Sequence, residues 1–463
     1  MVVVAGLCSA CSQDTSQTAD VNQNLTRQPP SPQKRMGSHA PSRIVAGGPG
    51  LEDDQIAADT LLEVNPSTGA SNVSDGGGVL GRQASGNTLG IDTLPNFTST
   101  FYFPGIIESL YGDFAQYTWA YTMMGRPPFG QSSSEHTTVI DAPIIPVIVD
   151  LRNADGSPRF LPGPNGTQIP MILDGTQYVD PVLKSPIFQN TKYSSSERGT
   201  QFPDAVHRAQ FFRMAEDDWH TRLNPVVKPA RRLVLIRGTY RFSADATGHL
   251  RFVMVDQNAF ANAMFPPTPD DTSTLVGGAE NSGDMKTTDM TTFLFPDTYL
   301  GDVSTGDCCV LGFHTYDVEP GNAVNNWREK HYVMNYSSWI TPGLFGGGFS
   351  DITALSHEIS ETFSDPFVAN ATPIWLAPNG LCQANLESGD VIEGLANATY
   401  PMTMNGYTYH PQNEALLQWF AGQSPSSAIG HAYSYPDQTV VTSAAVSQAP
   451  GCSGPASFAR TRP

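Results

Sequence analysis

The sequence predicts an α+β protein with a mixed or antiparallel sheet. Several apolar or alternating runs have the character of strands. Only a few segments carry apolar residues at helical spacing, and they do not alternate with the strands as βαβ units do. Gly (42) and Pro (37) are abundant, and charged residues make up only 15% of the 463 residues, against about 25% in a typical soluble domain. This composition favours an extracellular or envelope protein that is rich in strands and loops.

The strand predictions come from β-branched and aromatic residues in short runs. The run at 142–151 is almost wholly apolar, as in a buried strand, and the run at 249–260 alternates. The expected strands are 142–151, 231–242, 249–260, 308–318 and 330–340.

Three segments are predicted to be helices. The first is 202–223, with Asp204 as its N-cap, and a shorter one is 413–423, ending near Gly422. The third follows a Gly-rich stretch and reads "SDITALSHEISETFSDPF" over 350–367. Ser350 or Asp351 can cap this helix, and Pro366 is expected to end it.

The chain is expected to have three parts. Residues 1–11, "MVVVAGLCSAC", resemble the remnant of a signal or lipoprotein leader, although a disordered N-terminus is the alternative. Residues 12–95 have too few large apolar groups for a core, which predicts a disordered or irregular tether. Residues 96–463 are expected to form a single large domain. A secreted or envelope-anchored protein follows from this interpretation, with a candidate lipid anchor and no transmembrane span.

Charge excludes some partners. The formal net charge is −19, and the sequence has no run rich in Lys or Arg. Nucleic acids and anionic membrane surfaces both require basic groups, so neither is an expected partner.

The most specific signal is the pattern His-Glu-x-x-Glu in the third helix. At about 100° per residue, the apolar side chains of Ile352, Leu355, Ile359 and Phe363 share one face. The opposite face carries four polar residues: His357, Glu358, Glu361 and Asp365. His357 and Glu361 lie one turn apart, the spacing at which zinc proteases place two ligands, and Glu358 has the position of a general base. A solvated polar helix face is the alternative.

A second group of carboxylates supplies candidates for a third metal ligand. "CQANLESGDVIEG" contains Glu387, Asp390 and Glu393, and either Glu387 or Asp390 is the expected ligand. His410 and His431 are substitutes if these fail. His314, on a predicted strand, could also approach the site, but a packed or hydrogen-bonded role is expected for it. Zinc or another divalent metal such as manganese or calcium suits such a set. The alternative is that "ESGD" is only a turn.

"ALSHEISETFSDPF" followed by "NLESGD" resembles a group of bacterial secreted proteins of the HExxE type, which are similar to zincin metallopeptidases. The group is distantly similar to the plant phosphate-induced (Exordium-like) extracellular proteins, which lack the metal-binding residues. The resemblance covers about residues 300–440. It implies a zincin-like core, His357 as a ligand, Glu358 as the base and Glu361 in place of the second histidine.

Two functions are therefore expected as alternatives. The first is a metal-dependent hydrolase of peptide bonds, acting on a peptide or protein substrate. The second is a non-catalytic extracellular binding protein of the phosphate-induced type. Of the six cysteines, the adjacent Cys308 and Cys309 are expected to bond to different partners.

Overall fold

The fold is taken from a computed structural model of the chain. It describes residues 94–103, 117–128, 137–194, 198–269, 271–321, 323, 327–346, 348–378 and 382–445. It also describes four short strands nearer the N-terminus: β1 (Ser42–Arg43), β2 (Gln55–Ile56), β3 (Val79–Leu80) and β4 (Ser85–Asn87). The predicted leader at 1–11 lies outside the described residues, as does most of the tether predicted at 12–95.

The described residues form an α+β fold dominated by strands, as predicted, and the main sheet is mixed. Its order is β10–β7–β15–β19–β18, and β11 and β12 also pair with the long strand β7. Strands β7, β11, β12, β15 and β19 run parallel, whereas β10 and the end strand β18 run antiparallel to their neighbours. The bounds are β7 (Thr137–Arg152), β10 (Ile172–Asp174), β11 (His220–Val227), β12 (Arg231–Ile236), β15 (Met290–Pro296), β18 (Gly312–Glu319) and β19 (Lys330–Trp339).

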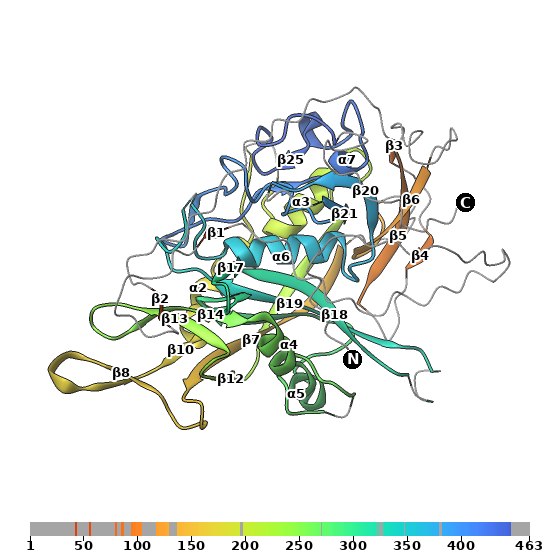
Figure 1. Cartoon of the computed structure of the whole chain (residues 1–463). Helices are drawn as coiled ribbons and strands as arrows, with labels where there is room; N and C mark the ends of the chain where they lie inside the picture. Colours follow the sequence, from red (N-terminus) through yellow and green to blue (C-terminus); the bar gives the residue numbers. More distant parts are fainter. Residues whose placement is uncertain are drawn as a thin grey trace, which may run out of the picture.

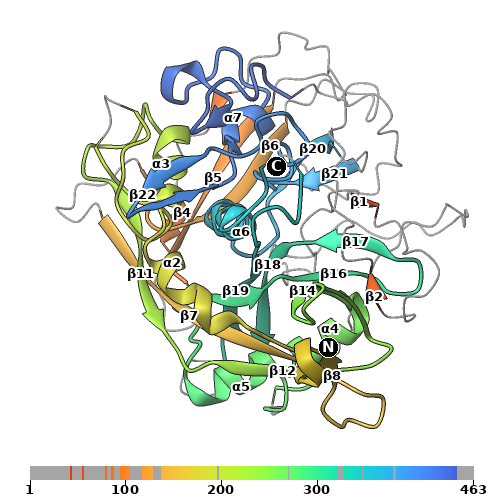
Figure 2. The same cartoon turned by 90° about the vertical axis from the view of Figure 1, so that its left-hand side faces the viewer.

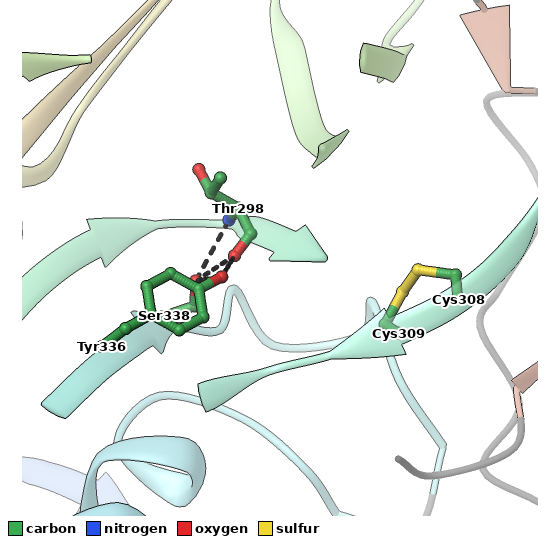
Figure 3. Close-up of a disulfide and its surroundings, with 5 residues drawn as sticks. All are labelled: Thr298, Cys308, Cys309, Tyr336 and Ser338. Carbon is green, nitrogen blue, oxygen red and sulfur yellow. Dashed lines mark hydrogen bonds between the residues drawn. A yellow bond between two sulfur atoms is a disulfide. The ribbon is translucent and has the colours of Figure 1, made fainter. Parts of the chain in front are cut away.

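A second sheet has the order β1–β17–β16–β14–β13–β2. Its longer strands are β13 (Tyr240–Ala244), β14 (Leu250–Asp256), β16 (Thr298–Asp302) and β17 (Asp307–Val310). The chain passes from β15 to β16 at Asp297, whose buried carboxylate accepts hydrogen bonds from Thr341 N (2.6 Å) and Tyr299 Oη (3.0 Å). Burial raises the pKa of Asp297 to about 6. The hydroxyls of Tyr336 and Ser338 on β19 donate to the Thr298 carbonyl, which ties the two sheets together (Figure 3).

The remaining strands form smaller units. A four-stranded sheet joins β3 and β4 to β5 (Asn96–Phe103) and β6 (Tyr117–Met124). The two-stranded units are β8 (Phe160–Pro162) with β9 (Gln168–Pro170), β20 (Ala371–Leu376) with β21 (Cys382–Asn385), β22 (Met402–Met404) with β23 (Tyr407–Tyr409), and β24 (Glu414–Ala415) with β25 (Ser434–Tyr435).

Helix α6 (Thr353–Ser364) lies across the main sheet and is covered from the other side. It packs against β18 and β19 and also contacts α3 and β6. Figure 1 shows α6 between the sheet and the C-terminal segments, and Figure 2 looks along its axis. The other α-helices of the described residues are α2 (Val179–Leu183), α3 (Phe202–Gln210), α4 (Gln257–Met264), α5 (Leu275–Ser282) and α7 (Leu417–Phe420), with 3-10 turns η1 (Pro164–Gly166), η2 (Gly175–Tyr178) and η4 (Ile429–His431).

Around β15, β18 and β19 the main sheet is buried on both faces, and successive side chains point to opposite faces. Phe293, Phe313 and Tyr336 point to one face, where they pack in a core with α4 and α5. Leu294 and Tyr316 point to the other face, in a core that includes α6. All four residues of the apolar arc predicted for this helix belong to that second core. Since successive strand residues alternate, Gly312 and His314 on β18 also face α6.

Two predicted helices are wrong over most of their length. The helix predicted at 202–223 ends at Gln210, and the chain then enters β11, which pairs with β7. Asp204 is not its N-cap, which is Gln201; the buried Asp204 carboxylate instead accepts hydrogen bonds from Thr200 Oγ1 (2.6 Å) and Thr221 N (2.7 Å). The helix predicted at 413–423 is reduced to α7, because Glu414 and Ala415 pair with β25.

The ends of α6 were predicted in part. The helix stops at Ser364, two residues before Pro366, as expected. However, neither Ser350 nor Asp351 caps its N-terminus, where Ile352 is the N-cap without a side-chain hydrogen bond. Asp351 is instead bonded to His410, with 2.7 Å between Oδ2 and Nδ1.

The strand predictions hold with changes at their ends. The runs at 142–151 and 330–340 correspond to β7 and β19, whereas 231–242 is divided by a turn into β12 and β13. The run at 249–260 leaves β14 to begin α4, since Asp256 caps that helix. The run at 308–318 is divided between β17 and β18, and so between the two sheets.

The expectation for the adjacent cysteines is wrong. Cys308 and Cys309 form a disulfide with each other (Figure 3). In an ordinary strand, neighbouring side chains point to opposite faces, which would separate the two sulfurs. Here the peptide bond between them is cis.

None of the helices in the described residues is long and apolar enough to cross a bilayer.

Candidate metal centre

The polar face of α6 is buried rather than solvated. His357, Glu358 and Glu361 are exposed by only 6%, 3% and 0%. His357 and Glu358 are adjacent, and Glu361 lies one turn after His357. All three are on the face of α6 that meets β18 and the turn at 387–393. The solvated-face interpretation of this helix is therefore wrong, because β18 and the C-terminal segments cover both sides of it.

His357 Nε2 is the centre of a set of short distances. It lies 3.2 Å from Glu361 Oε2, 3.4 Å from Asp390 Oδ1 and 3.9 Å from Glu358 Oε1. Zinc binds such atoms at about 2.0–2.2 Å in a tetrahedron, which places neighbouring ligand atoms about 3.3–3.6 Å apart. The distances from His357 to Glu361 and to Asp390 each fall in this range. The groups whose candidate ligand atoms all lie within 4.8 Å of one another are His357 with Glu358 and Glu361, and His357 with Asp390 and Glu393.

The residues predicted from the second carboxylate group all reach this cluster. Glu387, Asp390 and Glu393 are exposed by 3%, 1% and 6%. Asp390 lies next to His357. Candidate ligand atoms of His357, Asp390 and Glu393 all lie within 4.8 Å of one another. Glu387 lies further along, with Oε2 3.7 Å from His314 Nε2. The stretch 387–393 is a turn, as its composition suggested, and the same turn carries the acidic side chains into the interior.

His314 belongs to the same cluster, contrary to its expected role as a packed residue. Its Nδ1 lies 3.3 Å from Glu361 Oε2 and 3.6 Å from Glu358 Oε2. The side chain is 2% exposed. The available signal was the alternation of β18, in which Phe313 points into one apolar core and His314 therefore faces α6.

A set of outer hydrogen bonds holds the cluster in place. His357 Nδ1 lies 3.1 Å from Gln412 Oε1, and the Gln412 amide donates in turn to Gly389 O (2.7 Å). Glu361 Oε1 accepts from the Gly389 backbone N–H (3.0 Å), and Asp390 Oδ2 accepts from Gln383 Nε2 (2.6 Å). Each of these residues therefore uses one polar atom for support and presents the other to the cluster. Outer partners of this kind orient metal ligands and fix the histidine tautomer.

Several buried polar atoms of the cluster have no hydrogen-bond partner within the part of the chain that the structure describes. They are His314 Nδ1 and Nε2, His357 Nε2, Glu358 Oε2, Glu361 Oε2 and Glu387 Oε2. Nor does any described Lys or Arg form an ion pair with Glu358, Glu361 or Glu387. Buried polar atoms are nearly always satisfied, so a group of them aimed at one another fits a bound cation.

The electrostatics of the cluster point the same way. Burial raises the pKa of Glu387 well above its ordinary value, and the Glu361 charge adds to this. Burial also raises the pKa of Glu358, to about 7, against the opposing charge of His357. Burial alone would lower the pKa of both histidines, but nearby carboxylates raise it: Glu387 for His314, and Glu361 for His357. For Glu361, burial is outweighed by His357 and His314, which lower its pKa. The pocket is thus rich in negative charge and suits a positive ion.

The backbone approaches the cluster closely at two glycines. A Cβ atom at Gly389 would lie 2.5 Å from His357 Nδ1, and one at Gly312 would lie 2.6 Å from Glu358 Oε1. Neither contact is possible for a real side chain. The turn at 387–393 and strand β18 can therefore reach α6 only because these positions lack a side chain.

A small cavity reaches His357 and Glu358. Its volume is about 20 Å³, which is room for about one water molecule. Gly312, Phe349, Glu393 and Gln412 line it, with Cys309 of the disulfide and Leu311, Thr353 and Ala354.

The two substitute histidines lie elsewhere. His410 is held by Asp351 and Ser350, near the start of α6. His431 lies in η4 at the surface, where its Nδ1 is 2.7 Å from the Ser426 carbonyl oxygen. Neither belongs to the groups of candidate ligands in the described residues.

Comparison with known proteins finds no match: no family model, no curated protein and no solved structure corresponds to this chain. The assignment of a function therefore depends on the chemistry of the cluster.

Proposed function

We propose that the protein is a divalent-metal-dependent hydrolase of peptide bonds with a zincin-like core. The observation that carries the proposal is that Glu361 Oε2 and Asp390 Oδ1 lie 3.2 Å and 3.4 Å from His357 Nε2, in a buried pocket where no Lys or Arg balances Glu361 among the described residues. Three protein ligands with an open fourth position are the arrangement of a catalytic zinc site.

Each residue has a defined task in this proposal. His357, Glu361 and Asp390 hold the cation, and Gln412 orients the His357 ring. A divalent ion held there polarises the carbonyl of the substrate and increases the acidity of water. Glu358 lies beside the cavity. It accepts a proton from the attacking water while the water oxygen bonds to the carbonyl carbon. Glu358 then gives this proton to the leaving nitrogen as the C–N bond breaks.

The choice of a peptide substrate comes from the resemblance of residues 300–440 to zincin-like secreted proteins. The placement of α6 beside β18 supports it, because β18 ends the main sheet among the described residues and runs antiparallel to its neighbour. An end strand can align an extended peptide through its backbone groups.

One observation favours a second function. The cavity beside His357 and Glu358 has room for about one water molecule and not for a peptide. A cation in such an enclosed site would act as a structural support. The protein would then be a non-catalytic extracellular binding protein, the alternative expected from the sequence.

The experiment is metal analysis of the purified full chain together with peptide hydrolysis. We expect bound zinc or manganese in the wild type and in Glu358→Gln, and loss of the metal from His357→Ala. His431→Ala, a histidine outside the cluster, is the matched control and should retain the metal.

Hydrolysis separates the two functions. An enzyme should lose at least about 100-fold of its rate in Glu358→Gln, the lower end of general acid–base contributions, while retaining metal. Metal without hydrolysis of any peptide in a mixed library would favour the structural role. A wild type that refuses zinc and manganese on titration would overturn the hydrolase and leave the non-catalytic binding protein.

A further inference from the structure

The environment of His314 departs from that of an ordinary buried histidine. Such a residue normally bonds at least one ring nitrogen to the protein. Here neither nitrogen has a hydrogen-bond partner among the described residues, although the ring is buried. Instead, Nδ1 faces Glu361 Oε2 at 3.3 Å and Nε2 faces Glu387 Oε2 at 3.7 Å. Both nitrogens are thus directed at carboxylate oxygens that themselves lack a partner there.

Glu361 stands between two sets of ligands. Its Oε2 atom is 3.2 Å from His357 Nε2 and 3.3 Å from His314 Nδ1. On the His357 side lies Asp390, and on the His314 side lies Glu387. Candidate ligand atoms of His314, Glu361 and Glu387 all lie within 4.8 Å of one another. The cluster therefore has two histidines, each with its own carboxylate, and one carboxylate shared between them.

The number of donors exceeds what one ion requires. A catalytic zinc ion takes three protein ligands, whereas this cluster offers two histidines and the carboxylates of Glu358, Glu361, Glu387 and Asp390. The donors beyond His357, Glu361 and Asp390 include His314 and Glu387, which lie together beside Glu361.

We propose that His314, Glu361 and Glu387 form a second divalent-cation position, so that the cluster is a two-metal centre with Glu361 as the bridging ligand. Metal ions in two-metal hydrolytic sites lie about 3.5–4 Å apart, a separation that a shared carboxylate spans. One imidazole and two carboxylates suit zinc or manganese. This inference deepens the proposed function and rests on it for the first cation position.

The test is the stoichiometry of metal binding. The metal-depleted full chain is titrated with Mn²⁺, and bound metal is measured by elemental analysis after equilibrium dialysis. We expect two equivalents in the wild type and an exchange-coupled electron paramagnetic resonance spectrum. His314→Gln and Glu387→Gln should each lower the affinity for one of the two ions by more than about 100-fold and leave the affinity for the other unchanged. A loss of this size exceeds the 10–100-fold effect of changes to residues that only support the ligands. His431→Ala should bind two.

Each other outcome has a definite meaning. One equivalent in the wild type that both variants retain would overturn the second position and leave the proposed function standing, with His314 as a charged partner of the carboxylates. One equivalent that His314→Gln abolishes would also overturn it, because His314 would then serve the first ion. No binding to the wild type would overturn the proposed function as well. If His314→Gln fails to fold by circular dichroism, the nearly isosteric Glu387→Gln decides.

Discussion

At the scale of single residues, Gln412 determines how His357 is presented. Its side-chain oxygen is 3.1 Å from His357 Nδ1, and its backbone N–H donates to Ser356 Oγ (2.8 Å). When His357 Nδ1 carries the proton, Nε2 has its lone pair available for a cation. Gln412 is thus a positioning residue, which acts on the cation only through the orientation of the His357 ring.

We expect Gln412→Leu to weaken metal binding by about 10–100-fold, because it removes the acceptor that fixes the ring. Gln412→Glu keeps an acceptor at this position and should restore most of the affinity. Competition with a chelator of known affinity measures both. Equal affinity in Gln412→Leu and wild type would show that other contacts orient His357.

His207 is a second residue with a measurable effect, and it lies outside the metal cluster. It is buried among the rings of Phe97, Phe211, Trp219 and Phe363. Burial lowers the pKa of His207 to about 4, against the opposing influence of Asp204. The unfolded chain therefore binds a proton at higher pH than the folded chain does. The stabilising effect of neutral His207 is complete above pH 6.5 and is lost as the pH falls toward 4.

Because of this histidine, we expect the free energy of unfolding to fall by about 2 kcal/mol when the pH is lowered from 7.5 to 5. His207→Phe removes the titrating group and keeps an aromatic ring in the core. The pH dependence of its urea unfolding should be smaller than that of the wild type by that amount. Parallel curves for the two proteins would mean that His207 does not titrate as its surroundings indicate.

Site residues could be predicted from the sequence where they lie close together along the chain. His357, Glu358 and Glu361 share one helix, so their spacing alone brought them together. His314 and Gln412 could not be assigned, because their proximity to His357 depends on strand pairing and loop paths over 43 and 55 residues of separation. The preference for Asp390 over Glu387 beside His357 likewise depends on the turn at 387–393, whose conformation no local pattern specifies.

At the scale of elements, close approach of backbones defines the site. Strand β18 and the turn at 387–393 meet α6 at Gly312 and Gly389, where a side chain would overlap Glu358 and His357. Neither glycine has a positive φ angle. The requirement at these positions is therefore one of space and not of backbone conformation.

We expect Gly389→Ala and Gly312→Ala each to reduce metal binding and to destabilise the fold by about 1–3 kcal/mol, the usual cost of overpacking. Gly346→Ala is the matched control, since a Cβ there meets nothing within 4 Å and φ is not positive. Urea unfolding and metal titration of the three variants provide the comparison. A Gly389→Ala protein with wild-type metal affinity would contradict the described packing.

Element predictions succeeded where a segment had one strong pattern. The position of α6 and its apolar arc were predicted, because Pro366 and the helical spacing agree. The segment 202–223 was not, because its apolar spacing suits a helix whereas its second part is drawn into β11 by pairing with β7. That pairing joins residues about 80 positions apart, which a local pattern cannot express.

At the scale of the whole molecule, the candidate centre joins three distant parts of the chain. β18, α6 and the turn at 387–393 each contribute candidate ligands, and their apolar side chains are spread over three cores, one of which β18 and α6 share. A cation that binds only the folded arrangement stabilises all of it at once, by about 2.7 kcal/mol when the free ion is at 100 times its dissociation constant.

We therefore expect removal of metal by a chelator to lower the midpoint of thermal unfolding of the full chain, and excess zinc to restore it. The His357→Ala variant should unfold at the same temperature with and without the chelator. Differential scanning calorimetry measures both. An unchanged wild-type midpoint would mean that the cluster is folded and stable without a cation.

The burial of the cluster also determines how fast its contents can be replaced. Because His357, Glu361 and Asp390 are almost completely covered, an ion can leave only while β18, α6 or the turn at 387–393 opens. Exchange with an isotope in solution should then proceed at the rate of this opening and not rise with the concentration of a competing chelator. The slower this opening is, the longer the protein would keep the ion that it acquired when it folded.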